Sequence, residues 1–275
     1  MKPKTIIISG GDKGGSGKTA CLSAFVDALI ALGYSVRLID ADSATQTLTA
    51  IFPNRVVHSI ATDTEHASKE LDKALKDIAD NMTEDIAVVD MPGGGSTFVK
   101  KYFANKTTKD FEGVGLRIIV AVTAANNARI LKGVRAWLLE FAGTFPLICF
   151  KNNMAIGESS QFDLTKTNTG NAIIKLAGDH IIEIPSMNMD MKGEYDACFA
   201  VPSEFLLGGR ASTKLTLFPL RCIDWNIHHN KIIAAVASHA EWIAGKPIPN
   251  PPEVIHAKVN KVVASYLDKM SDDDL

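Results

Sequence analysis

The chain has 275 residues, of which 46% are hydrophobic and 22% are charged, and its formal net charge at pH 7 is -2. This length is sufficient for one large domain with a sizeable buried core. The small net charge excludes a chain-wide electrostatic attraction to nucleic acid or to an anionic membrane, but it does not exclude a local basic patch.

The four cysteines are too far apart in the sequence to form a CxxC motif, so a local zinc or iron–sulfur site is not expected. They are Cys21, Cys149, Cys198 and Cys222. We expect four reduced thiols, most of them buried. The apolar run near the start is too short for a signal peptide, and no stretch reaches the roughly 20 apolar residues that span a bilayer. These features predict a cytoplasmic protein.

The first expected elements are a strand, a glycine-rich loop and a helix. Residues 5–9 form a run rich in β-branched side chains, which is typical of a buried strand. After the loop, residues 19–33 carry apolar side chains at three- and four-residue spacing, which predicts an amphipathic helix. Gly33 suits the end of that helix, because glycine is the residue most often found there.

The alternation of apolar strands and helical segments continues to about residue 185. The expected elements are, in order, a strand at 36–40, a short segment at 45–52, a helix at 66–82, strands at 86–90 and 117–122, a helix at 126–141, and strands at 145–150 and 180–185. Continuously apolar strands separated by helices predict an α/β fold, with a mostly parallel twisted sheet covered by helices on both faces.

The last third of the chain is less regular. Residues 226–244 have helical periodicity, the proline-rich run 246–252 should end that helix, and a last helix is expected at 253–270. We expect a single domain over residues 1–275, with a core at 1–190 and a helical C-terminal extension at 190–275.

The segment from Gly10 to Thr19 has the sequence GGDKGGSGKT, between the first expected strand and helix. Glycines let backbone N–H groups turn inward and approach phosphates closely, and the helix N-terminus adds free donors. Lys18 is positioned to reach the β- and γ-phosphates of a nucleotide, and the Thr19 hydroxyl to bind magnesium. The expected cofactors are therefore ATP and Mg²⁺. The expected nucleotide-binding residues of this segment are Gly11, Asp12, Lys13, Gly14, Gly15, Ser16, Gly17, Lys18, Thr19 and Ala20.

The glycine-rich segment departs from the standard pattern G-x-x-x-x-G-K-[ST], because Asp12 stands where the first glycine belongs. The string KGGSGKT, which begins at Lys13, resembles the deviant Walker A motif of the ParA/MinD superfamily. The resemblance implies a P-loop NTPase-like fold. It also implies that Lys13 crosses a dimer interface and touches nucleotide held by the partner subunit, so that ATP is sandwiched between two protomers.

Two aspartates follow expected strands, at the end of a parallel sheet that faces the ligand crevice. Asp40, in IDADSATQ, is expected to orient the attacking water and to help organise magnesium. This segment is similar to the superfamily's switch I, IDxDPQ, but lacks its Pro-Gln. Capping of the next turn is the alternative role for Asp40 and Asp42. Asp90 ends the apolar run IAVV, which is the Walker B pattern that holds magnesium.

The run MPGGG after Asp90 resembles the superfamily's switch II, DxPxG, which implies that Gly93 senses the γ-phosphate. The expected catalytic residues are Lys13, Lys18 and Asp40. The expected magnesium-binding residues are Thr19, Asp40 and Asp90.

An asparagine after a later strand commonly reads the adenine edge in the superfamily, and Asn152 and Asn153 follow the expected strand 145–150. We favour Asn153, with plain turn chemistry as the alternative. The resemblance also implies that Pro185, at the end of the last expected strand, lies against the base.

The resemblance implies a Mg-ATP-dependent, dimerising ATPase switch with slow hydrolysis, used in partition or positioning of plasmid or chromosomal DNA. The implied partners are a second copy in the ATP state, a DNA-binding partner protein and non-specific DNA. Cations that could touch DNA are Lys100, Lys101, Lys106, Lys109, Arg210, Lys214 and Arg221. Membrane contact is not expected, because Asp272, Asp273 and Asp274 would be repelled by an anionic surface.

Two other functions stay open at this point. One is a P-loop metabolic enzyme that transfers phosphate to a small molecule or activates it. The other is a nucleotide-binding adaptor with negligible hydrolysis, which the altered segment after Asp40 keeps open.

Overall fold

The computed structural model describes residues 3–11, 15–42, 45–53, 55–59, 67–93, 96–154, 162–198, 200–206, 209–215 and 219–255, with the single residues 217, 257 and 261. The strands are β1 (Lys4–Gly10), β2 (Val36–Asp40), β3 (Val56–Ser59), β4 (Ile86–Asp90), β5 (Leu116–Ala124), β6 (Leu147–Asn152) and β7 (Ile181–Ile184). The α-helices are α1 (Lys18–Ala31), α2 (Thr47–Ile51), α3 (Ala67–Asn81), α4 (Ser96–Phe103), α5 (Thr108–Glu112), α6 (Ala128–Phe141), α7 (Asn168–Ala177), α8 (Met189–Cys198), α9 (Arg210–Lys214) and α10 (Pro219–Ala244).

The strands form one seven-stranded sheet in the order β3-β2-β4-β1-β5-β6-β7, and the paired strands run parallel. The chain first winds from the central β1 towards β3, and after β4 it crosses to β5 and winds the other way. The carboxyl end of β1 is therefore a topological switch point, where open parallel sheets form their ligand crevice. The expected α/β fold with a parallel sheet is confirmed.

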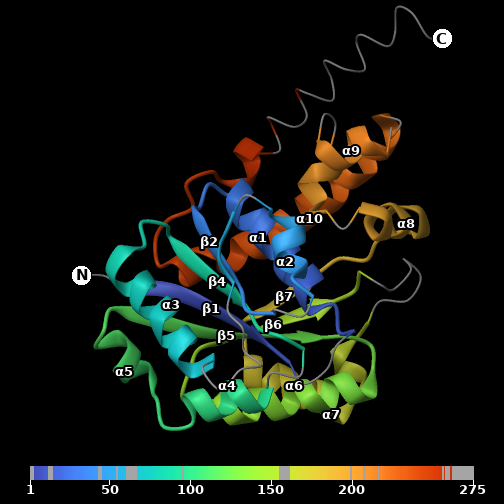
Figure 1. Ribbon diagram of the computed structural model, residues 1–275. Coiled ribbons are helices and arrows are strands. Elements are labelled where there is room, and N and C mark those ends of the chain that lie inside the picture. Colours follow the sequence, from blue (N-terminus) through green and yellow to red (C-terminus); the bar gives the residue numbers. More distant parts are fainter. Residues whose placement is uncertain are drawn as a thin grey trace, which may run out of the picture.

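Helices cover both faces of the sheet (Figure 1). Helices α1, α2 and α10 pack on one face, and α3, α4, α5, α6 and α7 pack on the other. Successive residues of β1 point to opposite faces, so Ile7 joins the core beneath α1 and α10, while Ile6 and Ile8 join the core beneath α3 to α7. Because both faces are covered, the central strands are apolar without a break, as the sequence indicated.

The segment after residue 190 completes the helix layer on the α1 face. Asp27 of α1 accepts hydrogen bonds from the Ser203 amide (2.9 Å) and hydroxyl (2.5 Å). The carboxylate of Asp27 also lies 3.2 Å from His229 Nε2 of α10. The predicted single domain with a boundary at residue 190 stays a prediction, but α10 packs as an integral part of this layer.

Two differences from the expected elements stand out. Strand β3 was not expected, because it is only four residues long and lies at the edge of the sheet. Helix α10 begins at Pro219, seven residues before the expected start at 226. Most of the expected helix at 253–270 lies outside the described residues. Of the helices that the structure describes, none combines the length and apolarity needed to span a membrane.

Candidate nucleotide-binding site

The glycine-rich loop connects the end of β1 to the start of α1, at the switch point of the sheet. Gly15 and Gly17 have φ angles of +83° and +76°, a conformation that side chains other than glycine rarely adopt. At Gly17 space is also lacking, because a Cβ atom there would lie 2.3 Å from Asn152 Nδ2. Asp12, Lys13 and Gly14, three of the expected nucleotide-binding residues, lie outside the described residues.

Asn152, at the end of β6, braces this loop. Its Nδ2 donates to the Ser16 carbonyl over 2.9 Å, and its Oδ1 accepts from the Met154 amide over 2.9 Å. The side chain is buried and both ends of its amide are used, so it fixes the loop against the sheet. The bond to Met154 is the turn chemistry that the sequence offered as the alternative role, whereas the bond to Ser16 was not anticipated.

Asp90 accepts hydrogen bonds from the polar groups on the β4 side of the loop. Its Oδ1 accepts from Lys18 Nζ and from Ser9 Oγ (3.1 Å), and its Oδ2 accepts from Thr19 Oγ1 (2.7 Å). Lys18 and Asp90 are only 8% and 1% exposed, so each charge depends on the other for compensation. The structure thus brings together the predicted lysine, hydroxyl and Walker B carboxylate.

Asp40 lies directly across from Asp90 in the pairing of β2 with β4, and it is fully buried. Its Oδ1 accepts from the Asp42 amide (3.1 Å), and its Oδ2 accepts from the amide (2.9 Å) and hydroxyl (2.8 Å) of Thr49. In this state Asp40 therefore anchors the first turn of α2.

Asp42 caps a turn, as its alternative role supposed, because its Oδ1 accepts from the Thr45 amide over 3.2 Å. The role of Asp40 in orienting water and binding magnesium stays a prediction. Gly93 lies in an exposed turn three residues beyond the end of β4, and its predicted contact with the γ-phosphate likewise stays a prediction.

Asn153 lies just beyond β6, where its amide is oriented by Glu183 of β7. Asn153 Nδ2 donates to Glu183 Oε1 over 2.7 Å, and Lys151 Nζ holds the other carboxylate oxygen over 2.9 Å. Because a carboxylate only accepts, the nitrogen of the amide must face Glu183. The opposite atom, Oδ1, is buried and has no hydrogen-bond partner in the described structure. A free acceptor suits the amino group of adenine, and Pro185 follows β7 next to it, but both base contacts stay predictions.

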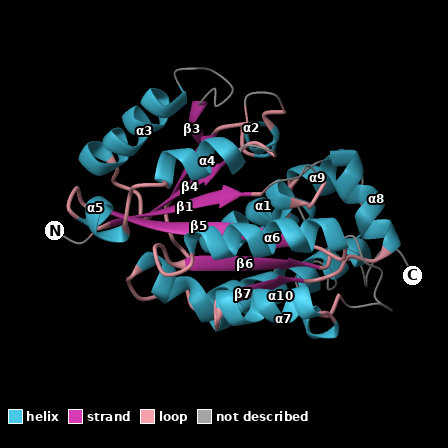
Figure 2. Cartoon of the chain, turned by 90° about the horizontal axis from the view of Figure 1, so that it is seen from below, coloured by secondary structure: helices cyan, strands magenta, loops and turns pink. Residues whose placement is uncertain are grey.

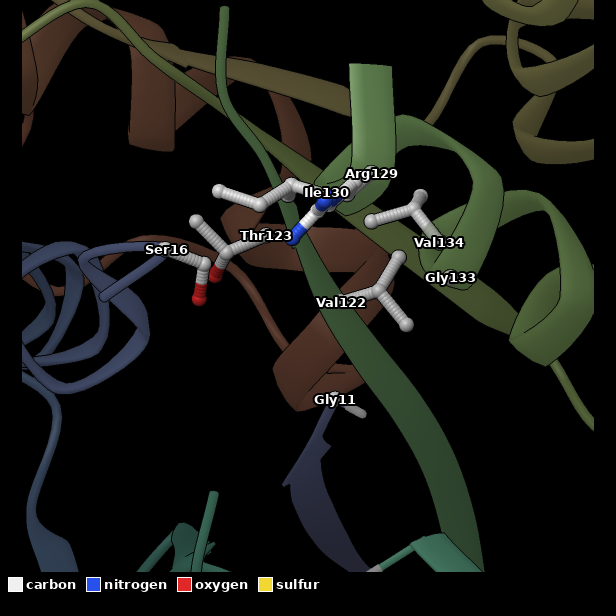
Figure 3. A pocket seen from close by; sticks show the side chains of 8 residues that line it. All are labelled: Gly11, Ser16, Val122, Thr123, Arg129, Ile130, Gly133 and Val134. Atoms are coloured by element: carbon white, nitrogen blue, oxygen red, sulfur yellow. The ribbon is translucent and has the colours of Figure 1, made fainter. Parts of the chain in front are cut away.

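The β5 side of the loop has a different character (Figure 3). Gly11, Ser16, Thr123 and Arg129 line a small pocket there, with Arg129 reaching from α6 across the end of β5. The Thr123 hydroxyl is buried without a hydrogen-bond partner in the part of the chain described. Sequence reasoning named neither Thr123 nor Arg129, since no motif marks them.

The residues present fit Mg-ATP. Helix α1 begins directly after the loop with no side-chain cap and no acidic residue in its first turn, so its first N–H groups are left for phosphate oxygens. Lys18 supplies an ammonium group, and Thr19 and Asp90 supply the oxygen ligands that magnesium prefers. Among the described residues no group of three or more His, Cys, Asp or Glu side chains forms an all-protein metal site. Such a site is not what magnesium with a nucleotide requires, because the ion keeps several waters and phosphate oxygens.

The cysteines are free, as expected, and three of the four are buried. Burial raises the pKa of the Cys149 thiol to about 12 and raises the pKa of Cys21 further. A low thiolate fraction makes these two side chains poor nucleophiles, so they act as core residues and not as reactive groups.

Comparison with known proteins agrees with this geometry. The sequence model of the ATPase MipZ family matches residues 5–108, which include the loop, Asp40 and Asp90. No curated protein sequence matches the chain. The septum site-determining protein MinD of Pyrococcus horikoshii OT3, solved with Mg-ADP, has a TM-score of 0.50 at 14% identity, covering 85% of this chain and 95% of that one.

Two further solved structures are similar. The MinD cell division protein of Aquifex aeolicus has a TM-score of 0.49 at 18% identity and covers 90% of this chain and 99% of that one. A plasmid partition protein of Borrelia burgdorferi B31, bound to AMPPNP, has a TM-score of 0.46 at 14% identity, with 82% and 99% covered.

At these sequence identities the structural similarity supports the fold alone. More specific evidence comes from the sequence motifs. The motif KGGSGKT lies between β1 and α1, acidic residues end β2 and β4, and the family match covers all three. Residues 5–108 therefore match a family of ATPases, and the chain has the fold of the P-loop NTPases.

Proposed function

We propose that this protein is a Mg-ATP-dependent ATPase switch that dimerises in its ATP state and helps to position or partition plasmid or chromosomal DNA. The observation that carries the proposal is the buried cluster in which Asp90 holds both Lys18 and Thr19 beside a glycine-rich loop. A lysine, a hydroxyl and a carboxylate in this order are the groups that P-loop ATPases use for phosphate and magnesium.

The cluster binds nucleotide by an exchange of partners. Lys18 would exchange Asp90 for phosphate oxygens, and Thr19 and Asp90 would supply oxygen atoms toward the magnesium ion. The bound Mg-ATP supplies the phosphoanhydride bond whose cleavage resets the switch. The backbone N–H groups from Gly15 to Ala20 hold the phosphates, supported by Asn152 behind the loop.

Asp40 links the site to the segment that follows it. Its carboxylate orients the attacking water once one of its oxygens is released from Thr49. Because the same carboxylate anchors α2, a change of partner at Asp40 alters the position of α2. We propose this linkage as the way in which the state of the nucleotide reaches the surface.

Lys13, which the resemblance assigns to the partner's nucleotide, completes the site in the dimer. Asn153 Oδ1 and Pro185 contact the adenine base, and Gly93 contacts the γ-phosphate. The partners are a second copy of the chain and a DNA-binding protein.

Two variants test the proposal. Lys18→Ala should abolish binding of a fluorescent ATP analogue. Asp40→Ala should retain ATP and accumulate as a dimer in analytical ultracentrifugation, since hydrolysis no longer dissolves it. Retained nucleotide affinity in Lys18→Ala would refute the phosphate-loop assignment, and a monomeric Asp40→Ala protein with saturating Mg-ATP would refute the dimer.

One observation favours a second candidate, a nucleotide-binding adaptor with negligible hydrolysis. Both carboxylate oxygens of Asp40 already accept hydrogen bonds from the chain, from Asp42 and from Thr49. With three of its roughly four acceptor sites occupied, Asp40 has little capacity left to position a water. Single-turnover measurement of ADP, with DNA present, distinguishes the two candidates, because the adaptor forms none.

A further inference from the structure

Three polar side chains form a chain of contacts at the carboxyl ends of β6 and β7. Figure 2 shows the two strands side by side at the edge of the sheet. Lys151 of β6 and Glu183 of β7 face each other in the strand pairing, and Asn153 follows β6 by one residue. Lys151 Nζ lies 2.9 Å from one carboxylate oxygen of Glu183, and Asn153 Nδ2 donates to the other over 2.7 Å. Glu183 thus uses one oxygen for its counter-charge and the other to hold an amide.

This arrangement fixes the Asn153 amide in one orientation. The backbone N–H of Asn153 donates to the Ile184 carbonyl over 3.0 Å, which continues the strand pairing past the end of β6. The side chain is 1% exposed, so it has little room to move. Because a carboxylate has no hydrogen to donate, turning the amide by half a rotation would set two acceptors against each other. Glu183 therefore determines which end of the amide faces away from β7.

The amide lies beside the phosphate loop. Asn152, the residue before it, donates to the Ser16 carbonyl of the loop over 2.9 Å. The carboxyl ends of parallel strands form the ligand crevice of such a sheet. At this position Asn153 Oδ1 is buried and has no hydrogen-bond partner among the residues that the structure describes. An orphaned buried acceptor is costly, so its retention indicates that a ligand supplies the missing donor.

We propose that Glu183 is a positioning residue that sets the base selectivity of the nucleotide site. By holding the nitrogen of the Asn153 amide, Glu183 leaves only the oxygen for the base, and this oxygen accepts from the amino group at position 6 of adenine. Guanine and hypoxanthine carry a carbonyl oxygen at that position, so two acceptors would meet there. The selectivity rests on the nucleotide binding of the proposed function, but it requires neither hydrolysis nor a dimer.

A structural tie between two strands is the competing explanation for the same contacts. In that case Glu183 would stabilise the edge strand β7 and would have no influence on the base. Glu183 is 46% exposed and Lys151 is 17% exposed, and an ion pair so open to solvent contributes little to stability. The two explanations differ in the ratio of the affinities for two bases, a quantity that a purely structural contact does not change.

The test is isothermal titration calorimetry with the magnesium complexes of ADP and inosine diphosphate (IDP). ADP carries an amino group at position 6 and IDP a carbonyl oxygen, and neither forms the ATP state. The unchanged chain should bind ADP roughly 10- to 100-fold more tightly than IDP, the range expected when a buried acceptor is left unpaired. Glu183→Gln should reduce the ratio to about threefold or less, because a glutamine amide both donates and accepts and so lets Asn153 turn.

A charge swap provides a stronger test, because it predicts a reversal. In Lys151→Glu/Glu183→Lys the two charges still pair across β6 and β7, but the group that faces Asn153 is now an ammonium, which only donates. The amide should turn its oxygen towards position 183 and its nitrogen towards the base. This variant should therefore bind IDP more tightly than ADP.

The matched control is Asp85→Asn. Asp85 also holds a lysine, Lys246, on one oxygen and a side-chain donor, the Ser35 hydroxyl (2.9 Å), on the other, but it lies just before β4, at the amino end of the sheet. It should leave the ratio of the ADP and IDP affinities unchanged. Asn152→Ala, which removes the brace of the loop, should weaken both nucleotides by the same factor, because the loop holds phosphate and not the base.

Three results would overturn the role of Glu183. They are an unchanged ratio in Glu183→Gln, an equal fall of the ratio in Asp85→Asn, and equal binding of ADP and IDP by the unchanged chain. Thermal unfolding is measured in parallel, and a lower melting temperature with an unchanged ratio would identify the structural tie instead. If the charge swap does not fold, Glu183→Gln decides alone. Failure of the unchanged chain to bind either nucleotide would refute the proposed function together with the selectivity, whereas equal binding of both refutes the selectivity only.

Discussion

The two sides of β1 differ in how completely their polar groups are satisfied. On the β4 side, Lys18, Asp90 and Thr19 are joined in one buried cluster. On the β5 side, the Thr123 hydroxyl has no partner among the described residues, and Arg129 forms no ion pair there. Both sides border the glycine-rich loop, because β4 and β5 are the two neighbours of β1 in the sheet.

The difference separates two kinds of site. The β4 side balances its charges internally, so it can stay folded and dry until a ligand offers better partners. On the β5 side the Thr123 hydroxyl is buried and is retained at a cost unless something binds it, whereas the exposed Arg129 is solvated. The first arrangement suits a ligand that replaces the internal ion pair, and the second leaves a buried hydroxyl available to a ligand.

The largest expected effect comes from breaking the charge balance on the β4 side. Without nucleotide, Lys18→Met and Asp90→Asn should each lower the free energy of unfolding by about 3 kcal/mol, because each leaves a buried charge without compensation. The double variant should lose much less than the sum. Urea denaturation of the four proteins measures the coupling, and strict additivity would show that the two side chains do not compensate each other.

A smaller effect is expected from the shape of the loop. Gly17→Ala must accept both a left-handed backbone and a Cβ atom at 2.3 Å from Asn152, so it should destabilise the nucleotide-free protein by about 3 kcal/mol. Gly15→Ala has the same sign of φ but open space, and should cost only about 1 kcal/mol. Thermal unfolding compares the pair. Equal losses would mean that Asn152 does not press against the loop.

The anchor of α2 should respond more weakly. Thr49→Val keeps the shape of the side chain but removes one of the two hydrogen bonds that Thr49 donates to Asp40. A loss of about 1.5 kcal/mol is expected from urea denaturation, the usual value for a hydrogen bond to a charged group. Thr47→Val, which removes an exposed hydroxyl that donates to Thr45, serves as the control and should be nearly neutral. A neutral Thr49→Val would argue against the anchor.

The smallest effect, with the opposite sign, belongs to the β5 side. Thr123→Val replaces a buried hydroxyl that has no partner with a methyl group of similar size. Stability should stay unchanged or rise by up to about 1 kcal/mol, because no hydrogen bond is lost and a desolvated group is removed. Clear destabilisation in the same urea assay would reveal a bound water or other partner at Thr123, and the contrast between the two sides would weaken.

Much of this site could be predicted because its residues belong to short, local sequence motifs. Lys18 and Thr19 belong to a contiguous motif, and Asp90 ends an apolar run, so strand ends and loop could be placed from the sequence. Asn152 could not be assigned its brace, since its partner Ser16 is 136 positions away and the contact exists only once β6 and β1 share a sheet. Thr49 and Arg129 escaped notice for the same reason.

The same distinction between local and long-range signals applies to the prediction of the fold. The parallel sheet was predictable from continuous apolar strands, whereas β3 was not, because four residues at a sheet edge carry little periodicity. The start of α10 was placed late, although a proline at the first helical position, where Pro219 stands, is a local signal for a helix start.

The pairing of Lys18 with Asp90 has a consequence for how the site discriminates among ions. A phosphate group arriving without a metal takes the lysine and leaves the carboxylate stranded in a buried position, and a divalent cation arriving alone strands the lysine. Only the joint arrival of both satisfies both. If the site binds Mg-ATP as proposed, the Lys18–Asp90 ion pair would favour the complete complex over free phosphate or free magnesium.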